Sequence, residues 1–549
     1  MIRITIDGHV ADLNEGTTVL EAIRALAPEQ AEKALGALCG GRSLELNFRL
    51  KHSGALKPLY YEDDEGRRIY ERTLRFVLLL AARRVLPDQR VRMEHSLGHG
   101  VYVTTPGHEI TQEELALLEN AMRDVVREDL PFVKERWSRK KAAQYFTQTG
   151  QTDTVRLLSY RPYDHYYMYH CGGMTEYYYG NMLPSTGYVP VFALSQASPG
   201  FVLQLPRPDR PDTPSAQVIW PKHMAAFQQS NEWCRILSCT NAPDVNDLIV
   251  SGRYRHFIRV NEALQDKSIA ALADGIQARD SRAVFIAGPS SSGKTTFANR
   301  LAIHLSVLGL SPFLISLDNF YRCRQEIPVK ADGSYDFEDL NALDIPLFHD
   351  CMKRLIGGEE VRLPEYDFTT GQSRRKKTPM KLSEGQLILI EGIHGLNPAL
   401  HSAFAPGDIS RVYISELTCI NLDDHNRIRT TDARLLRRIV RDYQFRGTPP
   451  NETMTMWANV REGEETWIFP YQEQADFVFN SVLHYELPVL RSIAYDLLTA
   501  IEPDNPNYLL SKRLIKLLNY FIPAGAELWD EIPPLSILRE FIGGNTLYK

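Results

Sequence analysis

A glycine-rich stretch in the second half of the chain has the composition of a phosphate-binding loop. Residues 288–295 read GPSSSGKT, directly after the apolar residues 283–287 and directly before apolar positions at helical spacing. In such a strand–loop–helix unit the glycines let backbone N–H groups surround phosphate oxygens, the lysine reaches the β- and γ-phosphates, and the threonine hydroxyl ligates Mg²⁺. We therefore expect ATP and Mg²⁺ as cofactors. The loop residues expected to bind them are Gly288, Pro289, Ser290, Ser291, Ser292, Gly293, Lys294, Thr295 and Thr296.

Two carboxylates follow other apolar runs of this region. Asp318 comes after residues 312–317, and Glu391 comes after residues 387–390. Ligands of parallel sheets bind at the carboxyl ends of the strands, so both side chains are expected to face the γ-phosphate. An aspartate after a strand is also common as a helix cap or turn residue, but the upstream loop favours the ligand role.

Arginines are concentrated in residues 427–446. Positioned guanidinium groups stabilise a phosphoryl group in transfer, and the choice of arginine over lysine indicates bidentate phosphate recognition. The spacing of four of the arginines places them on one face of a helix, which predicts a lid over the phosphates. A solvated basic helix or an RNA-binding patch is the alternative. The seven arginines are Arg427, Arg429, Arg434, Arg437, Arg438, Arg441 and Arg446.

These residues need a sheet to position them. From residue 283 onward, short apolar runs alternate with helical stretches, which predicts a parallel sheet with helices on both faces. Near the N-terminus, alternating isoleucines and a short helical pattern predict a small β-grasp-like unit. The expected fold class is a multidomain α/β and α+β chain, with a P-loop NTPase sheet preceded by a β-grasp unit and an α+β domain.

A chain of 549 residues is long enough for three or four domains. Four prolines within residues 206–214 interrupt both periodicities and indicate a connector. The expected division is a β-grasp unit at 1–62, an α+β domain at 63–205, a connector at 206–265, the P-loop domain at 266–490 and a helical extension at 491–549.

Composition excludes several classes of protein. The net charge of −6 creates no global field that attracts nucleic acid or acidic lipid. No apolar run approaches the roughly 18 residues of a membrane span, and the first residues alternate like a strand instead of forming a signal peptide. Seven cysteines without a Cys-x-x-Cys pair suit free thiols in a reducing compartment. We expect a cytoplasmic protein.

Six motifs from 283 to 480 resemble, in order, those of the uridine kinase and phosphoribulokinase family of P-loop kinases. They are GPSSSGKTT at 288, LDNFY at 317, YDFEDLNALD at 335, LPEYDFTTGQSR at 363, LIEGIHGL at 389 and RLLRRIVRDYQFRG at 434. The resemblance implies that Asp318 is the base facing the acceptor hydroxyl, that Lys294 acts with it in catalysis, and that Thr295, Asp318 and Glu391 surround Mg²⁺. It also implies substrate contacts from Glu338, Tyr366, Arg374 and Arg438, and nucleotide contacts from Arg441 and Arg446.

The chain departs from this family where a pyrimidine base would be recognised. Residues 369–374 read TTGQSR and contain no histidine, Arg-Gly-Arg becomes RGT at 446–448, and a Gln-Tyr pair becomes Met456-Trp457. Each change removes a polar group expected near the base or the sugar.

The first 205 residues resemble the front of threonyl-tRNA synthetase. MIRITIDGHVADLNEGTTVLEAI resembles its TGS domain, and SRKKAAQYFTQTGQTDTVRLL and HCGGMTEYYYG resemble its editing domain. The editing residues are not retained, because Phe76 and Leu80 replace two histidines and Thr175 follows Cys171 where a histidine is expected.

The function we expect is ATP-dependent phosphorylation of a nucleoside at its 5′-hydroxyl. A kinase for another sugar or phosphosugar is an alternative, and so is a nucleotide-dependent RNA- or ribosome-associated regulator. An Asn-Lys-x-Asp guanine motif is missing, which weighs against a GTPase. The expected partner is a nucleoside such as uridine. An RNA contact through the N-terminal domains and an oligomer are both compatible with the sequence.

Overall fold

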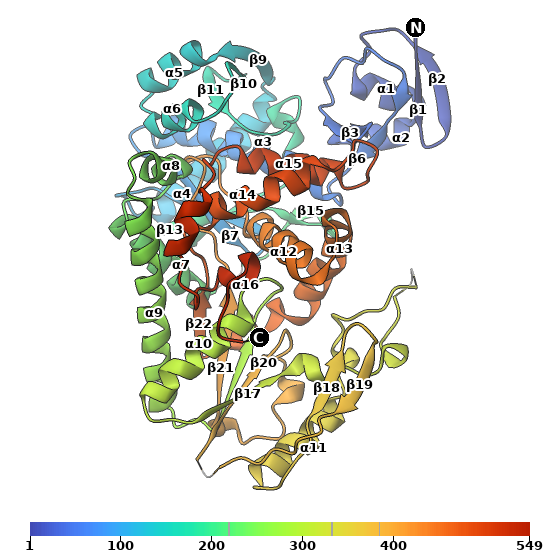
Figure 1. The fold of residues 1–549 in the computed structure, drawn as a ribbon. Coiled ribbons are helices and arrows are strands. Elements are labelled where there is room, and N and C mark those ends of the chain that lie inside the picture. The colour runs from blue at the N-terminus through green and yellow to red at the C-terminus, as the bar shows by residue number, and fades with distance from the viewer. Residues whose placement is uncertain (218–219, 331–332, 384, 549) are drawn as a thin grey trace.

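The computed structural model describes residues 1–217, 220–330, 333–383 and 385–548. It arranges them as a small N-terminal unit, an α+β domain, a helical segment, a parallel-sheet domain and a C-terminal extension (Figure 1). Among the described residues, no helix combines the length and the apolar character that crossing a bilayer requires.

The N-terminal unit packs helix α1 against two small sheets with strand orders β2-β1-β5 and β4-β3-β6. Thr18 caps α1, because its side chain accepts a hydrogen bond from the backbone of Glu21 and the Glu21 side chain accepts one in return. The elements are β1 (Ile2–Ile6), β2 (His9–Leu13), α1 (Val19–Leu26), α2 (Pro28–Ala31), β3 (Gly36–Cys39), β4 (Arg42–Leu44), β5 (Gly54–Ala55) and β6 (Lys57–Leu59).

The α+β domain is built around the long helix α3 (Asp64–Val85), whose residues from 68 to 82 are all buried. Its sheets have the orders β12-β13-β8-β7 and β11-β10-β9. The other elements are β7 (Arg92–Leu97), β8 (Gly100–Thr104), α4 (Gln112–Glu128), β9 (Val133–Ser138), α5 (Arg139–Gln148), α6 (Thr152–Ser159), β10 (His165–Cys171), β11 (Met174–Tyr177), β12 (Ala193–Ala197) and β13 (Gly200–Gln204).

The stretch expected to be a connector is folded. Its prolines lie in a two-stranded ribbon of β14 (Pro206–Arg207) and β15 (Arg210–Pro214), which tolerates them because no third strand requires their missing N–H groups. Three helices follow, namely α7 (Pro221–Ile236), α8 (Ala242–Val250) and α9 (Tyr254–Ala278). The boundary expected at residue 265 therefore falls inside α9, which shares its apolar core with the parallel sheet.

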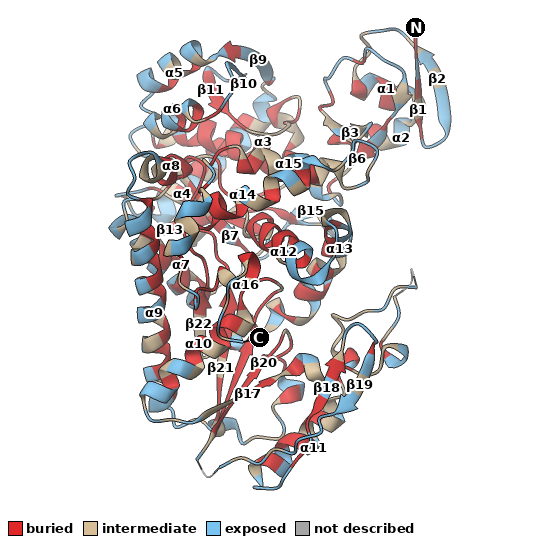
Figure 2. Cartoon of the chain, viewed as in Figure 1, coloured by how far each residue is buried: buried red, intermediate tan, exposed pale blue. Residues whose placement is uncertain are grey.

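The parallel sheet has the strand order β17-β20-β16-β21-β22, and all its pairings are parallel. Alternate residues of β16 point to opposite faces: Val284 packs with α9 and α10, and Phe285 packs with α11. Both β16 and β20 are buried along their whole length (Figure 2). The strands are β16 (Ala283–Ala287), β17 (Pro312–Ser316), β20 (Leu387–Glu391), β21 (Ile409–Ser415) and β22 (Phe477–Asn480).

Helices and a hairpin complete this domain and extend it. They are α10 (Lys294–Val307), α11 (Ile345–Ile356), the hairpin β18 (Pro364–Asp367) and β19 (Gln372–Arg375), α12 (Thr430–Arg446), α13 (Pro450–Trp467), α14 (Glu486–Thr499), α15 (Tyr508–Leu518) and α16 (Arg539–Ile542). The extension crosses back over the sheet domain, so that α16 packs against α12.

Buried ion pairs join the N-terminal half to α12. Glu71 of α3 accepts hydrogen bonds from Arg427, at 3.1 Å, and from Arg429. Arg68 of α3 and Arg513 of α15 both pair with Asp432, at 3.3 and 3.0 Å. Burial alone would raise the pKa of Glu71, but the arginines hold it well below its usual range, so the carboxylate is charged at neutral pH.

We expect Glu71→Gln to loosen this junction, because it leaves two largely buried guanidinium groups without a counter-charge. Removing one partner of a buried pair costs about 3–5 kcal/mol. Hydrogen–deuterium exchange of residues 427–436 should accelerate in the variant, whereas Glu113→Gln, at an exposed position of α4, should leave it unchanged. Equal exchange in the two variants would show that the junction does not depend on Glu71.

Candidate active site

The phosphate-binding loop leaves β16 and ends at α10, as its sequence predicts. Gly293, directly before the helix, has a φ of +85°, and Ser291 also has a positive φ of 60°. A Cβ at Gly288 would lie 1.9 Å from the carbonyl oxygen of Ile414, so only glycine fits there. Among the described residues, the buried hydroxyls of Ser291 and Ser292 have no hydrogen-bond partner. A loop of this shape with unused donors fits a polyphosphate.

Lys294 lies between the loop and the carboxylates at the strand ends. Its Nζ donates a hydrogen bond to the carbonyl oxygen of Pro289 at 3.1 Å. Burial lowers the pKa of Lys294, and the nearby charges of Glu391 and Asp318 oppose that shift. The lysine is therefore within electrostatic reach of both acidic groups that the sequence analysis selected.

Asp318 and Glu391 come together at the carboxyl edge of the sheet. Glu391 ends β20 and is in register with Ser316 of β17, two residues before Asp318. Burial and the nearby charge of Asp318 together raise the pKa of Glu391 to about 7. Burial also raises the pKa of Asp318, although Lys294 and Arg446 lower it, while its side chain remains reachable by solvent. Two carboxylates that repel each other next to Lys294, the first residue of α10, fit a divalent cation, and Thr295 follows that lysine in the helix.

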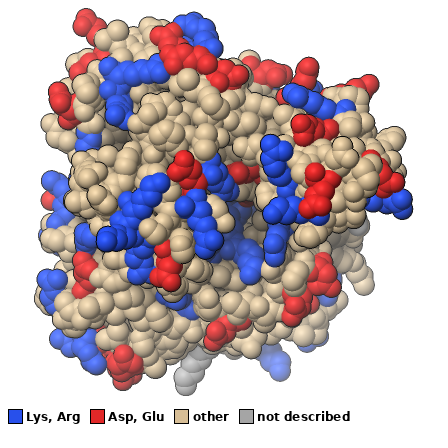
Figure 3. Space-filling model, turned by 90° about the horizontal axis from the view of Figure 1, so that it is seen from above, with Lys and Arg blue, Asp and Glu red and all other residues tan. Residues whose placement is uncertain are grey.

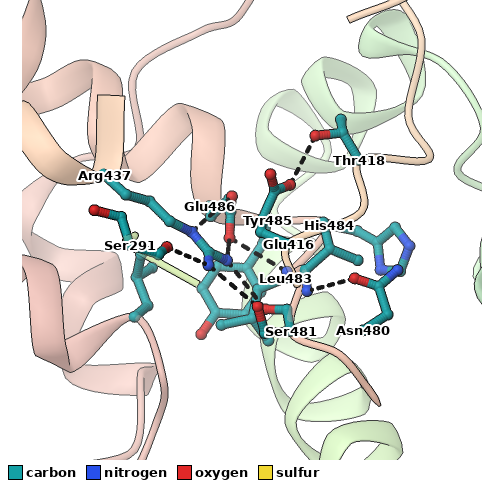
Figure 4. Close-up of polar contacts among 12 residues, drawn as sticks. Ser291, Glu416, Thr418, Arg437, Asn480, Ser481, Leu483, His484, Tyr485 and Glu486 are labelled. Atoms are coloured by element: carbon teal, nitrogen blue, oxygen red, sulfur yellow. Dashed lines mark hydrogen bonds and ion pairs between the residues drawn. The ribbon is translucent and has the colours of Figure 1, made fainter. Parts of the chain in front are cut away.

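Two of the arginines expected to form a lid instead bind the backbone of the phosphate loop. Arg437 is completely buried; it pairs with Glu486 and donates to the carbonyl oxygens of Ser481, at 3.0 Å, and Ser291, at 3.4 Å (Figure 4). Arg434 pairs with Glu464 and donates to the carbonyl oxygen of Ser290 at 3.0 Å. Both guanidinium groups are thus committed to protein partners.

Glu416 is a further carboxylate of this buried cluster. Its side chain accepts a hydrogen bond from the Thr418 hydroxyl at 2.7 Å, and its other oxygen has no hydrogen-bond partner among the described residues. Burial raises the pKa of Glu416 to about 8, the nearby Glu486 adds to the shift, and Arg437 opposes it. Glu416 is therefore mostly protonated at neutral pH, which leaves Glu486 as the counter-ion of Arg437.

The arginines toward the end of α12 gather around one carboxylate that the sequence analysis did not select. Asp442 pairs with Arg438 at 3.2 Å, with Arg441 at 2.9 Å and with Arg446 at 3.5 Å. Arg438 also donates to the Ser290 hydroxyl at 2.8 Å. Asp442 lies four residues after Arg438 and four residues before Arg446, and helix positions four apart are neighbours. This spacing is the signal in the sequence that identifies Asp442 as their partner. Asp442 holds these arginines on the loop side of the helix.

Aromatic rings cluster on the other side of Asp318. Tyr321 lies 5.5 Å from Tyr366 and 5.8 Å from Phe368 between ring centroids. The Tyr366 hydroxyl is buried without a hydrogen-bond partner in the described part of the chain, whereas Phe368 is 54% exposed. Burial raises the pKa of Tyr321 well above its usual value, and the charges of Asp318 and Glu338 raise it further, so both carboxylates lie near this cluster.

Glu338 and a histidine lie together near the cluster. Burial raises the pKa of Glu338 to about 7. His394, which follows Glu391 in the motif LIEGIHGL, is 1% exposed and sits beside the backbone of residues 338–339. Within the described residues neither ring nitrogen of His394 has a hydrogen-bond partner of acceptable geometry. The motif LIEGIHGL is a signal for this histidine in the sequence, but only the fold reveals its burial.

Other expected positions lie elsewhere. Arg374 is exposed on β19, in register with Glu365 of the same hairpin. Trp457, considered above only as a replacement residue, is buried with its ring 5.3 Å below the Arg434 guanidinium. In the α+β domain, Phe76 and Leu80 are buried, and burial raises the pKa of the Cys171 thiol to about 12.

Two parts of the chain are similar to known proteins of different kinds. Residues 283–487 match the profile of the Phosphoribulokinase / Uridine kinase family, so the C-terminal part carries a kinase domain of that type. The N-terminal region is similar to threonine–tRNA ligases: that of Symbiobacterium thermophilum is 30% identical over 197 residues, which are 35% of this chain and 30% of the ligase. The ligase of Burkholderia multivorans is 27% identical over 201 residues, 36% of this chain and 32% of the ligase. The chain spans about a third of the length of these relatives.

Solved structures are similar to part of the chain. One, described as a possible uridine kinase from Bacillus stearothermophilus, is 21% identical with a TM-score of 0.28 and covers 39% of this chain and 97% of its own. Another, D-glycerate 3-kinase from Cryptococcus neoformans, is 14% identical with a TM-score of 0.21 and covers 48% of this chain and 89% of its own.

We expect the buried proton of Glu416 to make stability depend on pH. The folded-state pKa of about 8 lies above the ordinary value of 4.5, so the native state binds more protons between these pH values and loses stability as pH rises. Glu416→Gln should remove this contribution, which amounts to at most about 1.4 kcal/mol per pH unit. Thermal unfolding at pH 5 and pH 8.5 measures it: the variant should gain on the wild type only at the higher pH, and exposed Glu365→Gln should not.

Proposed function

We propose that residues 283–487, as a kinase domain of the phosphoribulokinase and uridine kinase type, transfer the γ-phosphoryl group of ATP to the 5′-hydroxyl of a nucleoside. The observation that carries the proposal is the position of Asp318 between the phosphate loop and the aromatic cluster. It lies within electrostatic reach of Lys294 on the loop side and of the aromatic cluster on the other side. An acceptor stacked on the rings therefore presents its hydroxyl to Asp318.

The residues of the loop and of α12 hold and align the reactants. When bound, ATP with Mg²⁺ supplies the phosphoryl group. Lys294 and the N-terminal end of α10 balance negative charge at the phosphates, while Thr295, Asp318 and Glu391 hold the cation. Arg438, Arg441 and Arg446, oriented by Asp442, bring positive charge to the leaving and transferred groups. Alignment and charge stabilisation of this kind account for most of the rate in phosphoryl transfer.

Asp318 receives the proton of the acceptor hydroxyl. The carboxylate is solvent-accessible, and Lys294, Arg446 and Arg441 favour its charged form. An acceptor hydroxyl held within hydrogen-bond distance of it is oriented for in-line attack on the γ-phosphorus. Its proton passes to the carboxylate as the new P–O bond forms and the bond from the γ-phosphorus to the bridging oxygen of ATP breaks, which releases ADP. Glu338 and Tyr366 bind the rest of the acceptor from the aromatic side.

A kinase for a sugar or phosphosugar is the second candidate, and one observation favours it. The buried ring of His394 has no side-chain hydrogen-bond partner among the described residues and lies beside the backbone of residues 338–339, where its ring nitrogens could offer a donor or an acceptor to a polyol. The aromatic cluster favours the nucleoside instead, because every base presents a π-face that such rings can stack on.

The front half supports a further expectation, an RNA contact. On the face drawn in Figure 3, Lys and Arg side chains gather around a hollow. In the α+β domain, Tyr167 is 57% exposed, and the Lys134 ammonium lies 5.4 Å from its ring centroid. A cation beside an exposed ring is a platform for an unpaired base.

Replacing the carboxylate that receives the proton tests the chemistry. Asp318→Asn should lower kcat by about 10²- to 10⁴-fold, the usual contribution of a positioned acid–base group. Lys294→Ala should lose most turnover as well, with an unchanged unfolding midpoint in both variants. Asp350→Asn, on the exposed side of α11, is the matched control and should keep full activity. An Asp318→Asn enzyme with near-normal turnover would exclude the role given to this residue.

The acceptor is identified by measuring ATP consumption with uridine, cytidine, adenosine, guanosine, ribulose 5-phosphate and RNA. Because the base-reading groups of the similar family are replaced here, we expect nucleosides to be accepted with no more than about 10- to 200-fold discrimination between bases. Phe368→Ala should raise KM for nucleosides about tenfold, since stacking is worth about 1–3 kcal/mol, and leave KM for a phosphosugar unchanged. Turnover of ribulose 5-phosphate alone, lost in His394→Ala, would establish the sugar kinase instead, and ATP consumption that needs only RNA would establish the regulator.

A further inference from the structure

Residues 537–548, in the C-terminal extension, lie on the phosphate-binding site. After α15 the extension returns to the sheet domain, where Ile537, Leu538 and Phe541 are fully buried. In Figure 1 the C-terminus lies beside α10 and α16. Ile537 touches Gly293 of the phosphate loop, and the Phe541 ring lies 5.2 Å from the Arg437 guanidinium. The segment is thus anchored at the loop itself.

Three side chains of this segment converge on Thr296, in the first turn of α10. Glu540 Oε2 accepts hydrogen bonds from the Thr296 hydroxyl at 2.7 Å and from the Thr296 backbone N–H at 3.4 Å. The Tyr548 hydroxyl lies 3.0 Å from the same threonine oxygen, and the Asn545 amide lies 3.5 Å from it. Between them, Gly543 and Gly544 have φ values of +90° and +77°, which turn the chain back toward α10.

The bond between Glu540 and Thr296 has the chemistry of a phosphate contact. The first N–H groups of a helix lack intrahelical partners and carry a positive partial charge, which is why they bind anions. In a loop of this sequence those N–H groups receive the phosphates of a nucleotide. The Glu540 oxygen accepts hydrogen bonds from both the N–H and the hydroxyl of Thr296. It therefore occupies the position at which a phosphate oxygen of a nucleotide would accept the same hydrogen bonds. The loop holds a second such contact, since Glu464 accepts from the Ser290 N–H at 3.1 Å.

The two carboxylates differ in how firmly they are held. Glu464 is fully buried and pairs with Arg434 and Arg461. Glu540 lies on the four-residue helix α16, and no ion pair with a basic side chain is present for it among the described residues. Beyond it, the exposed Gly544 connects to residues that pack mainly through Asn545 and Tyr548. The contact made by Glu540 is therefore the one that an incoming phosphate can displace.

We propose that Glu540, with Asn545 and Tyr548, is an internal anionic ligand that competes with the nucleotide for the N-terminal end of α10. The inference rests on the proposed function, because it requires the loop to bind a nucleotide. The contact of this segment with Thr296 lowers the apparent affinity for the nucleotide. The apparent affinity is the intrinsic affinity multiplied by the fraction of molecules in which the N-terminal end of α10 is free. If the segment is in place nine-tenths of the time, affinity is lowered about tenfold.

Calorimetric titration with ATP and Mg²⁺, without an acceptor, tests the competition. Glu540→Ala should bind ATP about tenfold more tightly than the wild type, and a chain ending at Gly544, which keeps Glu540 but lacks Asn545 and Tyr548, should also bind more tightly, by a smaller factor. The matched control is Asp530→Asn, which removes one negative charge from an exposed position of the same extension and should leave Kd unchanged. The truncated chain keeps all the anchoring residues, so it serves where the point variant folds poorly.

Hydrogen–deuterium exchange supplies a readout that does not depend on turnover. In the wild type, ATP should accelerate exchange of residues 543–548, and in Glu540→Ala this exchange should already be fast without ATP. Equal or weaker ATP binding by Glu540→Ala and by the truncated chain, while the wild type binds, would overturn the inference and assign Glu540 a neutral or supporting part in the nucleotide site. Failure of every protein, wild type included, to bind ATP would instead overturn the proposed function, and the inference with it.

Discussion

The ion pair between Arg437 and Glu486 is the constraint on which the phosphate site depends. A guanidinium group in the interior is tolerated only when a carboxylate and further acceptors surround it, and here the acceptors include a carbonyl oxygen of the phosphate loop itself. The loop, the end of β22 and helices α12 and α14 are consequently tied to a single buried charge. Glu416, held in its neutral form nearby, completes the cluster without adding a second negative charge.

Helix α12 carries this constraint to both ends of the molecule. Its beginning and the residues just before it pair with α3 of the α+β domain and with α15, its middle supports the loop, and its end holds the arginines around Asp442. A domain similar to part of threonine–tRNA ligases is thereby joined to a kinase domain through charges that are largely inaccessible to solvent. The front half is part of the architecture that positions the site, although the residues that would perform editing chemistry are replaced.

Much of the fold was predictable because its signals are local. The capping residue Thr18, the alternation of β16 and the glycines of the loop each act through neighbours in sequence, and the helices and strands they predict are present. The proline-rich stretch was wrongly predicted to be without regular structure. Proline is excluded from central strands because it lacks an N–H donor, but β14 and β15 form a sheet of only two strands, where that donor is not required. The connector expected at 206–265 instead contains α7, α8 and the beginning of α9, because the break that the prolines impose ends with the ribbon.

The sequence by itself determined the phosphate loop, the order of the kinase motifs and the carboxylates Asp318 and Glu391, because each of these follows from a residue type at a fixed distance along the chain. Only the tertiary structure decided which of the seven arginines are free to meet a phosphate, that His394 is buried beside Glu338, and that Glu540 reaches Thr296 across 244 residues. The physical reason is that a charged or polar side chain takes its role from the partner it meets in space. Those partners are brought together by packing between elements far apart in the chain, and no local pattern records them.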